Sequence, residues 1–460
     1  MNRTLAIKLG AIALLILLLL IPLLMIGGLV GDRQANRNDV VQDIARSSAY
    51  EQRVTGPLVV VPYERTEREW QREKDKARVL VTSTVKGTLY FLPDSFLLDG
   101  QMTTELRHRG IYEARLYHMN GRISGRFVLP ANYGITDKVD DYRFGQPYLA
   151  VGLSDVRGIE NALKLSFNGK LTDFSPGSQV QVLGEGVHAD LPLAMGSGVA
   201  EQRFDYAFEL GLLGSSRLAV TPMGRDSQVA LASDWPHPSF GGEFLPVERK
   251  VSDSGFEAHW RSSFFATNLE DVVHSCIRQG DCNAEAWPAF GVSLVDPVDQ
   301  YLKSDRALKY ALLFIGLTFA GFFLFEVLKG LSVHPMQYAL VGLALALFYL
   351  LLLSLSEHLG FELAYGISAS ACVGLIGIYL SAVLRGSLRA LGFSAGLAAL
   401  YAMLYGLLRA EDYALLMGSV LLFVLLAGVM LLTRRVDWSR IGQGTPPPSF
   451  SMDDVEVQGE

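Results

Sequence analysis

The chain has 460 residues, of which 50% are hydrophobic and 19% charged, whereas roughly 25% are charged in an average soluble protein. Long uncharged apolar runs near both ends account for the deficit, which excludes a simple cytosolic protein, a disordered chain and a collagen-like fibre. The net charge of -7 gives no reason to expect nucleic-acid binding. Three cysteines are too few for a disulfide-rich scaffold or a four-cysteine zinc site.

The first apolar run, Leu9–Gly31, is free of charge and long enough to cross a bilayer, which takes roughly 20 helical residues. Arg3 and Lys8 precede the run and favour a cytoplasmic N-terminus. A cleaved signal peptide is the alternative, but the run is longer than a usual signal core and no A-x-A site follows it. We therefore expect residues 1–31 to form a cytoplasmic stub and an uncleaved transmembrane helix.

Further apolar runs crowd the C-terminal third, and each is long enough to span a membrane. A series of buried soluble helices is a poor alternative, because the runs follow one another with only short loops between them. Residues 307–435 are therefore predicted to form a five-helix transmembrane bundle. The expected spans are about 308–328, 336–356, 363–384, 390–408 and 413–433.

Alternation of these spans places both termini in the cytoplasm and residues 32–306 outside it. The connections near Lys329–His334 and Arg385–Arg389 then lie inside, and the acidic Ser356–Glu362 connection lies outside, in agreement with the positive-inside rule. Residues 436–460 combine prolines with acidic residues and predict a disordered cytoplasmic tail. A bacterial inner membrane, with residues 32–306 in the periplasm, is one home for this topology.

Residues 32–306 are too long for a connection and must fold as a domain. Arg33–Arg53 has apolar residues at helical spacing and predicts an amphipathic helix that continues from the anchor. Glu64–Lys76 mixes both signs of charge, which is typical of a solvated hairpin tip or loop. Beyond Gly56-Pro57 the apolar period changes to two, so we expect a large β-rich (α+β) domain inserted between the first and second spans of a multi-pass α-helical membrane protein. Its predicted strands include Leu58–Val61, Arg78–Val85, Thr88–Leu92, Tyr112–Tyr117, Gln179–Leu183, Phe204–Leu210 and Gln228–Ala232.

The cysteines are expected to have structural roles. Apolar residues recur at helical spacing over Leu269–Ile277, which predicts a helix that ends near Gly280 and has Cys276 on its buried face. Cys282 follows just beyond this end, and in an oxidising compartment the pair could close a short disulfide. Two unpaired, buried small side chains are the alternative, and we favour the disulfide. Cys372 lies in the middle of a predicted span and is interpreted as a packing residue.

Polar residues at the expected inner membrane edge are candidates for function. Glu326 lies three residues before Lys329 and could pair with it, and an intramembrane carboxylate can serve as a proton relay. Extension of the Glu326 side chain to the interface explains its position as well. His334 precedes Pro335 and is interpreted first as a cap, and Gln337 lies at the same edge.

Two other clusters are weaker candidates. Glu357 and His358, with Glu362, could bind a metal at the outer edge, but we favour a solvated loop because their spacing matches no strong motif. Trp235 and His237 lie among prolines, where they form either a rigid recognition surface or a stiff turn with a buried tryptophan. The sequence contains no G-x-S-x-G, H-E-x-x-H, P-loop or G-x-G-x-x-G motif, so neither catalytic residues nor a cofactor or metal is expected.

Several motifs occur in order along nearly the whole chain. They are G-P-L-V-V-V-P at 56–62, R-G-I-Y at 109–112, D-V-R-G-I at 155–159, W-P-H-P-S-F at 235–240, A-L-K-Y at 307–310, L-T-F at 317–319, F-F-L-F-E at 322–326, H-P-M-Q-Y at 334–338 and S-L-S-E-H at 354–358. These motifs resemble the CreD family of inner-membrane proteins, often called cell envelope integrity proteins. The resemblance implies an anchor, a large periplasmic domain and a bundle of spans. It also implies membership of a two-component regulon and links to envelope integrity, colicin tolerance and β-lactam response, without an established catalytic residue set.

Two functions from different classes follow as expectations. In the first, the chain is a non-enzymatic protein of the envelope-stress response whose periplasmic domain binds an envelope protein, lipid or glycan. In the second, it is a transporter or a lipid-handling protein that uses Glu326 in the bundle. A periplasmic hydrolase is a weaker third reading, because it would need acidic, histidine and serine side chains converging in one cleft. Membrane lipids are expected partners in each case, and nucleic acid is not.

Overall fold

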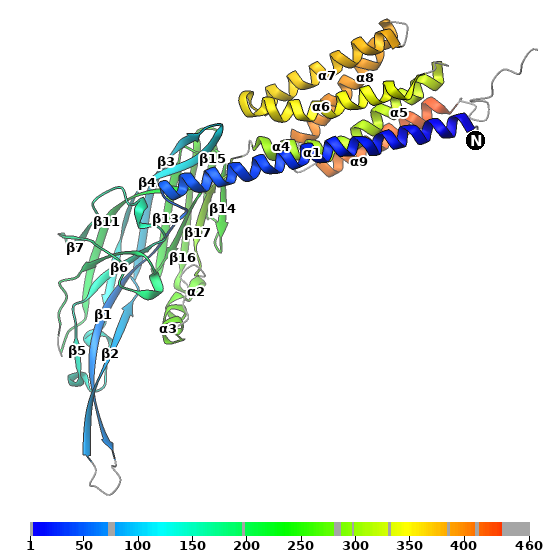
Figure 1. The fold of residues 1–460 in the computed structure, drawn as a ribbon. Coiled ribbons are helices and arrows are strands. Elements are labelled where there is room, and N and C mark those ends of the chain that lie inside the picture. The colour runs from blue at the N-terminus through cyan, green and yellow to red at the C-terminus, as the bar shows by residue number, and fades with distance from the viewer. Residues whose placement is uncertain are drawn as a thin grey trace, which may run out of the picture. The chain divides into compact units, whose positions relative to one another are not determined.

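The computed structural model describes residues 3–71, 79–195, 198–279, 287–296, 299–329, 333–383, 387–409 and 414–434. The chain forms two compact units. The helical unit combines Met1–Asn36 with Val298–Glu460, and the β-rich unit is Arg37–Pro297. Helix α1 (Arg3–Ser47) contributes its first part to the helical unit and its last turns to the β-rich unit (Figure 1).

The helical unit consists of long apolar helices. After α1 come α4 (Gln300–Lys309), α5 (Ala311–Lys329), α6 (Pro335–Leu359), α7 (Phe361–Val383), α8 (Ser387–Arg409) and α9 (Ala414–Thr433). Within the described residues, α1, α6, α7 and α8 are long and apolar enough to cross a membrane, and α4 with α5 forms a fifth candidate bent by 44°. The last predicted span falls on α9. The apolar helical stretch found there, Gly418–Gly428, is too short to cross a membrane.

Close helix packing holds α1 in this unit. Gly342 of α6 lies where a Cβ would overlap the side chains of Leu19 on α1 and Phe319 on α5. Small residues at such positions let helices approach closely, which is how apolar helices gain dispersion contacts in a lipid environment. The ring of Phe322 also packs on Tyr338 with centroids 4.7 Å apart. Helices α1, α5 and α6 therefore share one core.

The β-rich unit contains two sheets. The first has the spatial order β14 (Pro238–Gly242), β17 (Phe290–Leu294), β12 (Arg217–Pro222), β1 (Gln52–Gln71), β6 (Tyr148–Leu153), β10 (Gly186–Asp190) and β9 (Ser175–Pro176), with β2 (Val79–Phe91) and β5 (Tyr142–Phe144) also paired to β1. The second has the order β15 (Glu248–Ser252), β16 (Gly255–Ser263), β13 (Asp226–Ser233), β3 (Ser95–Arg109), β4 (Tyr112–Leu129), β11 (Gln202–Ser215), β7 (Lys164–Phe167) and β8 (Lys170–Asp173). Most neighbours are antiparallel, but β1–β12 and β3–β13 are parallel.

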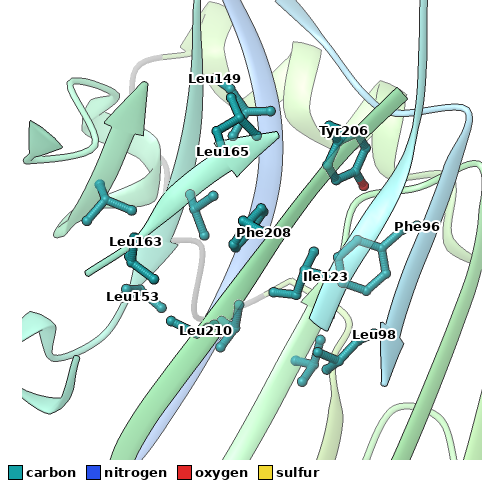
Figure 2. Close-up of a cluster of buried hydrophobic side chains, with 14 of the residues drawn as sticks. Phe96, Leu98, Ile123, Leu149, Leu153, Leu163, Leu165, Tyr206, Phe208 and Leu210 are labelled. Atoms are coloured by element: carbon teal, nitrogen blue, oxygen red, sulfur yellow. The ribbon is translucent and has the colours of Figure 1, made fainter. Parts of the chain in front are cut away.

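The main core of this unit combines residues from both sheets. Leu149 and Leu153 of β6 lie in the same buried cluster as Ile123 of β4 and Phe208 and Leu210 of β11 (Figure 2). In β11 the residues Phe204, Tyr206, Phe208 and Leu210 are buried and alternate with more exposed ones. This is the period-two pattern of a sheet with one buried face. The prediction of a strand over Phe204–Leu210 is confirmed, and the strand extends beyond it.

Several predicted strands merge or are replaced. Arg78–Val85 and Thr88–Leu92 were expected as two strands, but β2 continues through Gly87, whose missing Cβ leaves room for the ring of Tyr63 on β1. Residues 181–183 form the 3-10 helix η4 (Gln181–Leu183) instead of the predicted strand. Here the hydroxyl of Ser178 donates to the carbonyl oxygen of Gly184 (2.6 Å) and accepts the backbone N–H of Val180 (3.2 Å), so a turn occupies this segment.

The chain leaves α1 earlier than predicted. The amphipathic helix was expected over Arg33–Arg53, but α1 ends at Ser47 and β1 starts at Gln52, which pairs with Leu218 of β12. The predicted hairpin tip or loop at Glu64–Lys76 is also largely strand, because β1 runs to Gln71 and the remaining residues lie outside the described ones.

Five further short helices complete the described β-rich unit. They are α2 (Phe264–Thr267), α3 (Leu269–Gln279) and the 3-10 helices η1 (Ala131–Gly134), η2 (Val139–Asp141) and η3 (Val156–Gly158). Helix α3 confirms the helix predicted from apolar spacing, with Leu269 and Val273 buried and Cys276 half-buried. Cys282 lies outside the described residues, so the Cys276–Cys282 disulfide stays a prediction.

Candidate functional site

The carboxylate of Glu326 on α5 is buried in the helical unit, with 5% of the residue exposed. It forms an ion pair with the ammonium of Lys8 on α1. It also accepts hydrogen bonds from the backbone N–H of Val333 at 3.0 Å and from the hydroxyl of Tyr338 on α6 at 2.9 Å. Lys8, which is 318 positions away, and two residues shortly after Glu326 therefore converge on one carboxylate.

This arrangement compensates a charge that is costly to bury. A carboxylate in an apolar interior is tolerated when it has an opposite charge and hydrogen-bond donors around it. Glu326 has both, and its side chain does not extend to an exposed position as the interface interpretation required. The groups present can neutralise a negative charge, join α1, α5 and α6, and exchange a proton between carboxylate, phenol and ammonium.

His334 and Gln337 organise the start of α6 beside this cluster. The backbone N–H of Met336 donates to Nδ1 of His334 at 3.2 Å, and the backbone N–H of His334 donates to Oε1 of Gln337 at 3.1 Å. Together they form a capping box, with Pro335 at the first helical position. The interpretation of His334 as a cap is confirmed, and neither side chain contributes one of the described contacts to Glu326.

Glu357, near the other end of α6, is a half-buried residue whose side chain is only 9% exposed. Its Oε1 lies 3.5 Å from Nε of Arg33 on α1 and 3.3 Å from the hydroxyl of Tyr301 on α4, which donates to it. The expectation of a solvated loop at Ser356–Glu362 is therefore wrong for Glu357. Helix α6 continues to Leu359 and α7 starts at Phe361, so the connection is Gly360, which has a φ of 76°.

Glu357 and its two predicted companions do not converge. His358 and Glu362 are exposed, whereas Glu357 faces Arg33 and Tyr301. Within the residues that the structure describes, no group of three or more His, Cys, Asp or Glu side chains is placed to hold a metal ion.

A groove lies between α7 and α8 and has a volume of about 600 Å³. Small residues such as Gly366, Ala369 and Ala402 line it together with Tyr365 and Tyr401. The hydroxyl of Tyr365 donates to the carbonyl oxygen of Tyr401 at 2.7 Å, which joins the two helices at the base of the groove. Glu326 does not line it.

In the β-rich unit, Trp235 is half-buried in a turn, and His237 is exposed beside it with ring centroids 5.7 Å apart. The indole N–H of Trp235 donates to the carbonyl oxygens of His237 and Val295, each at 3.1 Å. The guanidinium of Arg115 on β4 lies over the indole ring, 3.6 Å from its centroid. The indole N–H and one face of the ring therefore contact other residues of the same fold. This favours the interpretation of the segment as a stiff turn.

Asp155, within one of the family-like motifs, fixes the end of α1 in the β-rich unit. It is buried, and it pairs with Arg157 at 2.6 Å and accepts the backbone N–H of Tyr50 at 3.1 Å. Arg157 in turn donates to the carbonyl oxygen of Arg46 in the last turn of α1 at 2.7 Å. The Arg157 guanidinium holds the pKa of Asp155 below its usual value, and burial opposes this effect.

A histidine that the sequence patterns did not single out lies between two carboxylates. Nε2 of His118 on β4 is 3.0 Å from Oε2 of Glu105 on β3, and Nδ1 is 2.8 Å from Oε1 of Glu160. The hydrogen bond with Glu105 has the largest effect on the pKa of His118 and raises it. The bond with Glu160 raises this pKa too, while burial lowers it. His118 and then Arg107 hold the pKa of Glu105 below its usual value. Strand alternation places Glu105 and His118 on one face of the sheet, and the pairing of β3 with β4 brings these two together.

The fold and these sites define a membrane protein with several apolar helices and a large β-rich domain. A family model described as "Inner membrane protein CreD" matches residues 4–439. The inner membrane protein CreD of Escherichia coli (strain K12) is 40% identical over 427 residues, which are 92% of this chain and 91% of that protein. The chain therefore belongs to the CreD family of inner membrane proteins, and the resemblance inferred from its motifs is confirmed.

Solved structures add little. An M1 zinc metallopeptidase from Deinococcus radiodurans aligns with 44% of this chain and 41% of its own at 6% identity and a TM-score of 0.19. A mutant of the same enzyme aligns over 44% and 42% with a TM-score of 0.20. The chain thus spans less than half of those proteins, and a likeness of this size carries no argument about fold or activity.

Proposed function

We propose that the chain is a non-enzymatic inner-membrane protein that maintains the cell envelope under stress. In this proposal its β-rich unit lies in the periplasm and binds an envelope protein, lipid or glycan. Both termini lie in the cytoplasm, and the helical unit serves chiefly as the anchor.

The contacts of Glu326 carry the proposal. Its carboxylate is occupied by Lys8, Val333 and Tyr338, so the charge is neutralised in place and joins three helices. An ion pair of this kind is what an anchor requires of a charge within its apolar helices. The second pair, Arg33–Glu357, joins α1 to α6 in the same way. Family membership supports the envelope role, because the matched relative is an inner membrane protein.

Transport is the second candidate, and the burial of Glu326 favours it. A buried carboxylate beside a phenol and an ammonium could bind and release a proton during a transport cycle. The groove between α7 and α8 could receive an apolar cargo, although Glu326 lies outside its lining. The two proposals differ in what they require of Lys8 and Glu326. Transport requires their charges, whereas an anchor requires only that the helices pack.

A charge-removal series distinguishes them in cells that lack the native gene. Lys8→Met leaves the buried carboxylate without its counter-charge, so we expect reduced folded protein. The double variant Lys8→Met with Glu326→Gln removes both charges and keeps a side chain that can still accept from Tyr338. Each variant is checked for membrane insertion and then scored for tolerance of colicins and β-lactams.

If the helical unit is an anchor, the double variant inserts and supports tolerance, whereas deletion of residues 60–295 abolishes it. If transport through Glu326 is the function, the double variant inserts normally and fails. Failure of both with normal insertion would favour transport that also depends on the β-rich unit. Full tolerance of the deletion variant would contradict the envelope-binding role of that unit.

A further inference from the structure

Among the described residues, no strand lies beside the outer edge of β2. In the part of the chain that the structure describes, β2 (Val79–Phe91) pairs with β1 and with no other strand. Figure 1 shows the far part of the β1–β2 hairpin extending past the other strands of the unit. Leu80, Val81 and Val85 in this part are exposed. A two-stranded ribbon is marginally stable in water, and a bare edge offers unpaired N–H and C=O groups to another strand.

The two edges of this hairpin differ in charge. The β1 strand carries acidic and basic residues in its extending part, and Arg68 forms an ion pair with Asp141 at 3.3 Å. Such charges protect an edge strand from pairing with other chains. The β2 strand has one charged residue, Lys86, which is paired with Glu64 of β1 at 3.2 Å. The fold therefore leaves β2, and not β1, suited to accept a strand.

The residue pattern of β2 is symmetric about Ser83. Thr82 and Thr84 flank it, and Val81 and Val85 lie one step further out. When two copies of such a strand pair antiparallel with Ser83 opposite Ser83, threonine meets threonine and valine meets valine. Cross-strand pairs of these types stabilise antiparallel sheets. Lys86 then lies opposite Leu80, and the two lysines are separated by about six residues, or roughly 20 Å, so they do not repel each other strongly.

We propose that two copies of this chain associate through their β2 edges, antiparallel and with Ser83 on the two-fold axis. The product is one continuous sheet in which β1 and β2 of one copy are followed by β2 and β1 of the other. The interface is isologous, since the same residues face each other in both copies. Main-chain hydrogen bonds supply the pairing, and two valine–valine pairs on one face of the ribbon, one on each side of the axis, fix its register.

Cysteine substitution tests the position of the axis in the full-length chain in its membrane. In the proposed sheet, directly opposed Cβ atoms lie about 4.5–5.5 Å apart, close enough for a disulfide after small adjustment. Ser83→Cys is therefore expected to give a covalent dimer when treated with copper-phenanthroline. Glu67→Cys is the matched control: Glu67 pairs with Ser83 across the hairpin, but its two copies would be separated by three strand spacings, about 14 Å. It is expected to stay monomeric, as is the unsubstituted chain.

A charge exchange tests the register independently. Val81 of one copy faces Val85 of the other, so Val81→Lys with Val85→Glu places opposite charges across the axis, and Val81→Lys with Val85→Lys places like charges there. We expect the first double variant to keep the dimer, measured by the Ser83→Cys crosslink in the same background, and the second to reduce it at least tenfold. Both variants bear the same number of changes at exposed positions, so insertion and folding are compared directly.

Three results overturn the proposal. One is a Ser83→Cys variant that inserts normally and stays monomeric. Another is equal crosslinking of Ser83→Cys and Glu67→Cys, which reports random collision. The third is a crosslinked product whose mass corresponds to this chain and a different protein, since the edge then accepts another partner.

Discussion

His118 is a residue whose charge determines which hydrogen bonds it can make. A neutral imidazole has one N–H, so it can donate to one carboxylate, whereas the imidazolium can donate to Glu105 and Glu160 together. Its raised pKa means that folding favours the protonated form. The stabilisation is therefore fully present below the unfolded pKa of about 6.5 and is lost as pH rises through the folded value.

Replacement of His118 by Gln should consequently lower the midpoint of thermal unfolding more at pH 6 than at pH 9. The side chain of His118 is 31% exposed, so solvent weakens the ion pairs and the difference should be about 2 °C. Circular dichroism of the full-length chain in detergent measures it at both pH values. Glu105, whose pKa is lowered, stays ionised over this range and does not contribute to the difference.

His237→Gln at an exposed turn position is the matched control for this measurement. A loss of stability in His118→Gln that is the same at both pH values would contradict a role for the imidazolium. It would indicate that packing of the ring alone matters.

Local sequence identified some residues of the candidate site and not their partners. Position beside Pro335 was sufficient to predict His334 as a cap. Glu326 was marked as notable by its place in an apolar run, but Lys329 was the partner that spacing offered, and Lys8 is the one that the structure gives. The pair depends on the packing of α1 against α5, which no short window of sequence encodes.

At the scale of elements, β4 is the centre of the second sheet, with β3 and β11 on its two sides. Gly125 of β4 faces Phe96 of β3 and Tyr206 of β11. A Cβ at this glycine would overlap the carbonyl oxygen of Ser95 and meet the Tyr206 hydroxyl, which itself donates to that oxygen at 3.3 Å. The position admits no side chain without a shift of the β3 backbone.

Gly125→Ala is therefore expected to destabilise the chain by about 1–3 kcal/mol, the usual penalty of overpacking. Gly241→Ala in β14 is the matched control, because a Cβ there has nothing within 4 Å. Thermal unfolding of both variants in the same detergent measures the effect. Equal midpoints for the two alanine variants would show that β3 can move away at little cost.

The presence of a strand could be predicted where one of its faces is buried and the other is exposed to solvent. The alternation in β11 is of this kind. The extent of strands could not be predicted, because β1 and β2 continue into exposed positions whose residues carry little periodic signal. The strand predicted over residues 179–183 is wrong, because a turn held by Ser178 shows the same apolar alternation as a strand.

At the scale of the whole molecule, the orientation in the membrane is the prediction that matters most. His334 and His358 are exposed at opposite ends of α6, and 358 minus 334 gives 24 residues, or about 36 Å of helix. This length exceeds a hydrocarbon core of about 30 Å. The two positions should therefore lie on opposite sides of the membrane.

Cysteine labelling measures that orientation. In spheroplasts, a membrane-impermeant maleimide should react with His358→Cys and His237→Cys, and with His334→Cys only after lysis. The unsubstituted chain gives the background from its own cysteines. Labelling of His334→Cys in intact spheroplasts together with protection of His358→Cys would reverse the proposed topology.

The helical unit could be predicted from the length of its apolar runs, because the thickness of the bilayer fixes the length of a span. The charges of the connections predicted its orientation. Four of the predicted spans correspond to helices that are long and apolar enough by themselves. The span predicted over 308–328 falls mainly on α5, which is preceded by α4 and a bend of 44°. The bend leaves no trace in hydropathy. The fold of the β-rich unit could be anticipated only as β-rich, since its sheet order depends on pairings between distant strands.

The ion pair between Lys8 and Glu326 joins residues that are 318 positions apart. At a synthesis rate of about 5–20 residues per second, the ribosome needs roughly 15–60 s to travel from one to the other. During that interval Lys8 has not yet met Glu326, while the whole β-rich unit, Arg37–Pro297, is synthesised. The C-terminal helices are thus synthesised last, after α1 and the β-rich unit. The ion pair can therefore form only after α5 has been synthesised, and α6 to α9 still follow it in the chain.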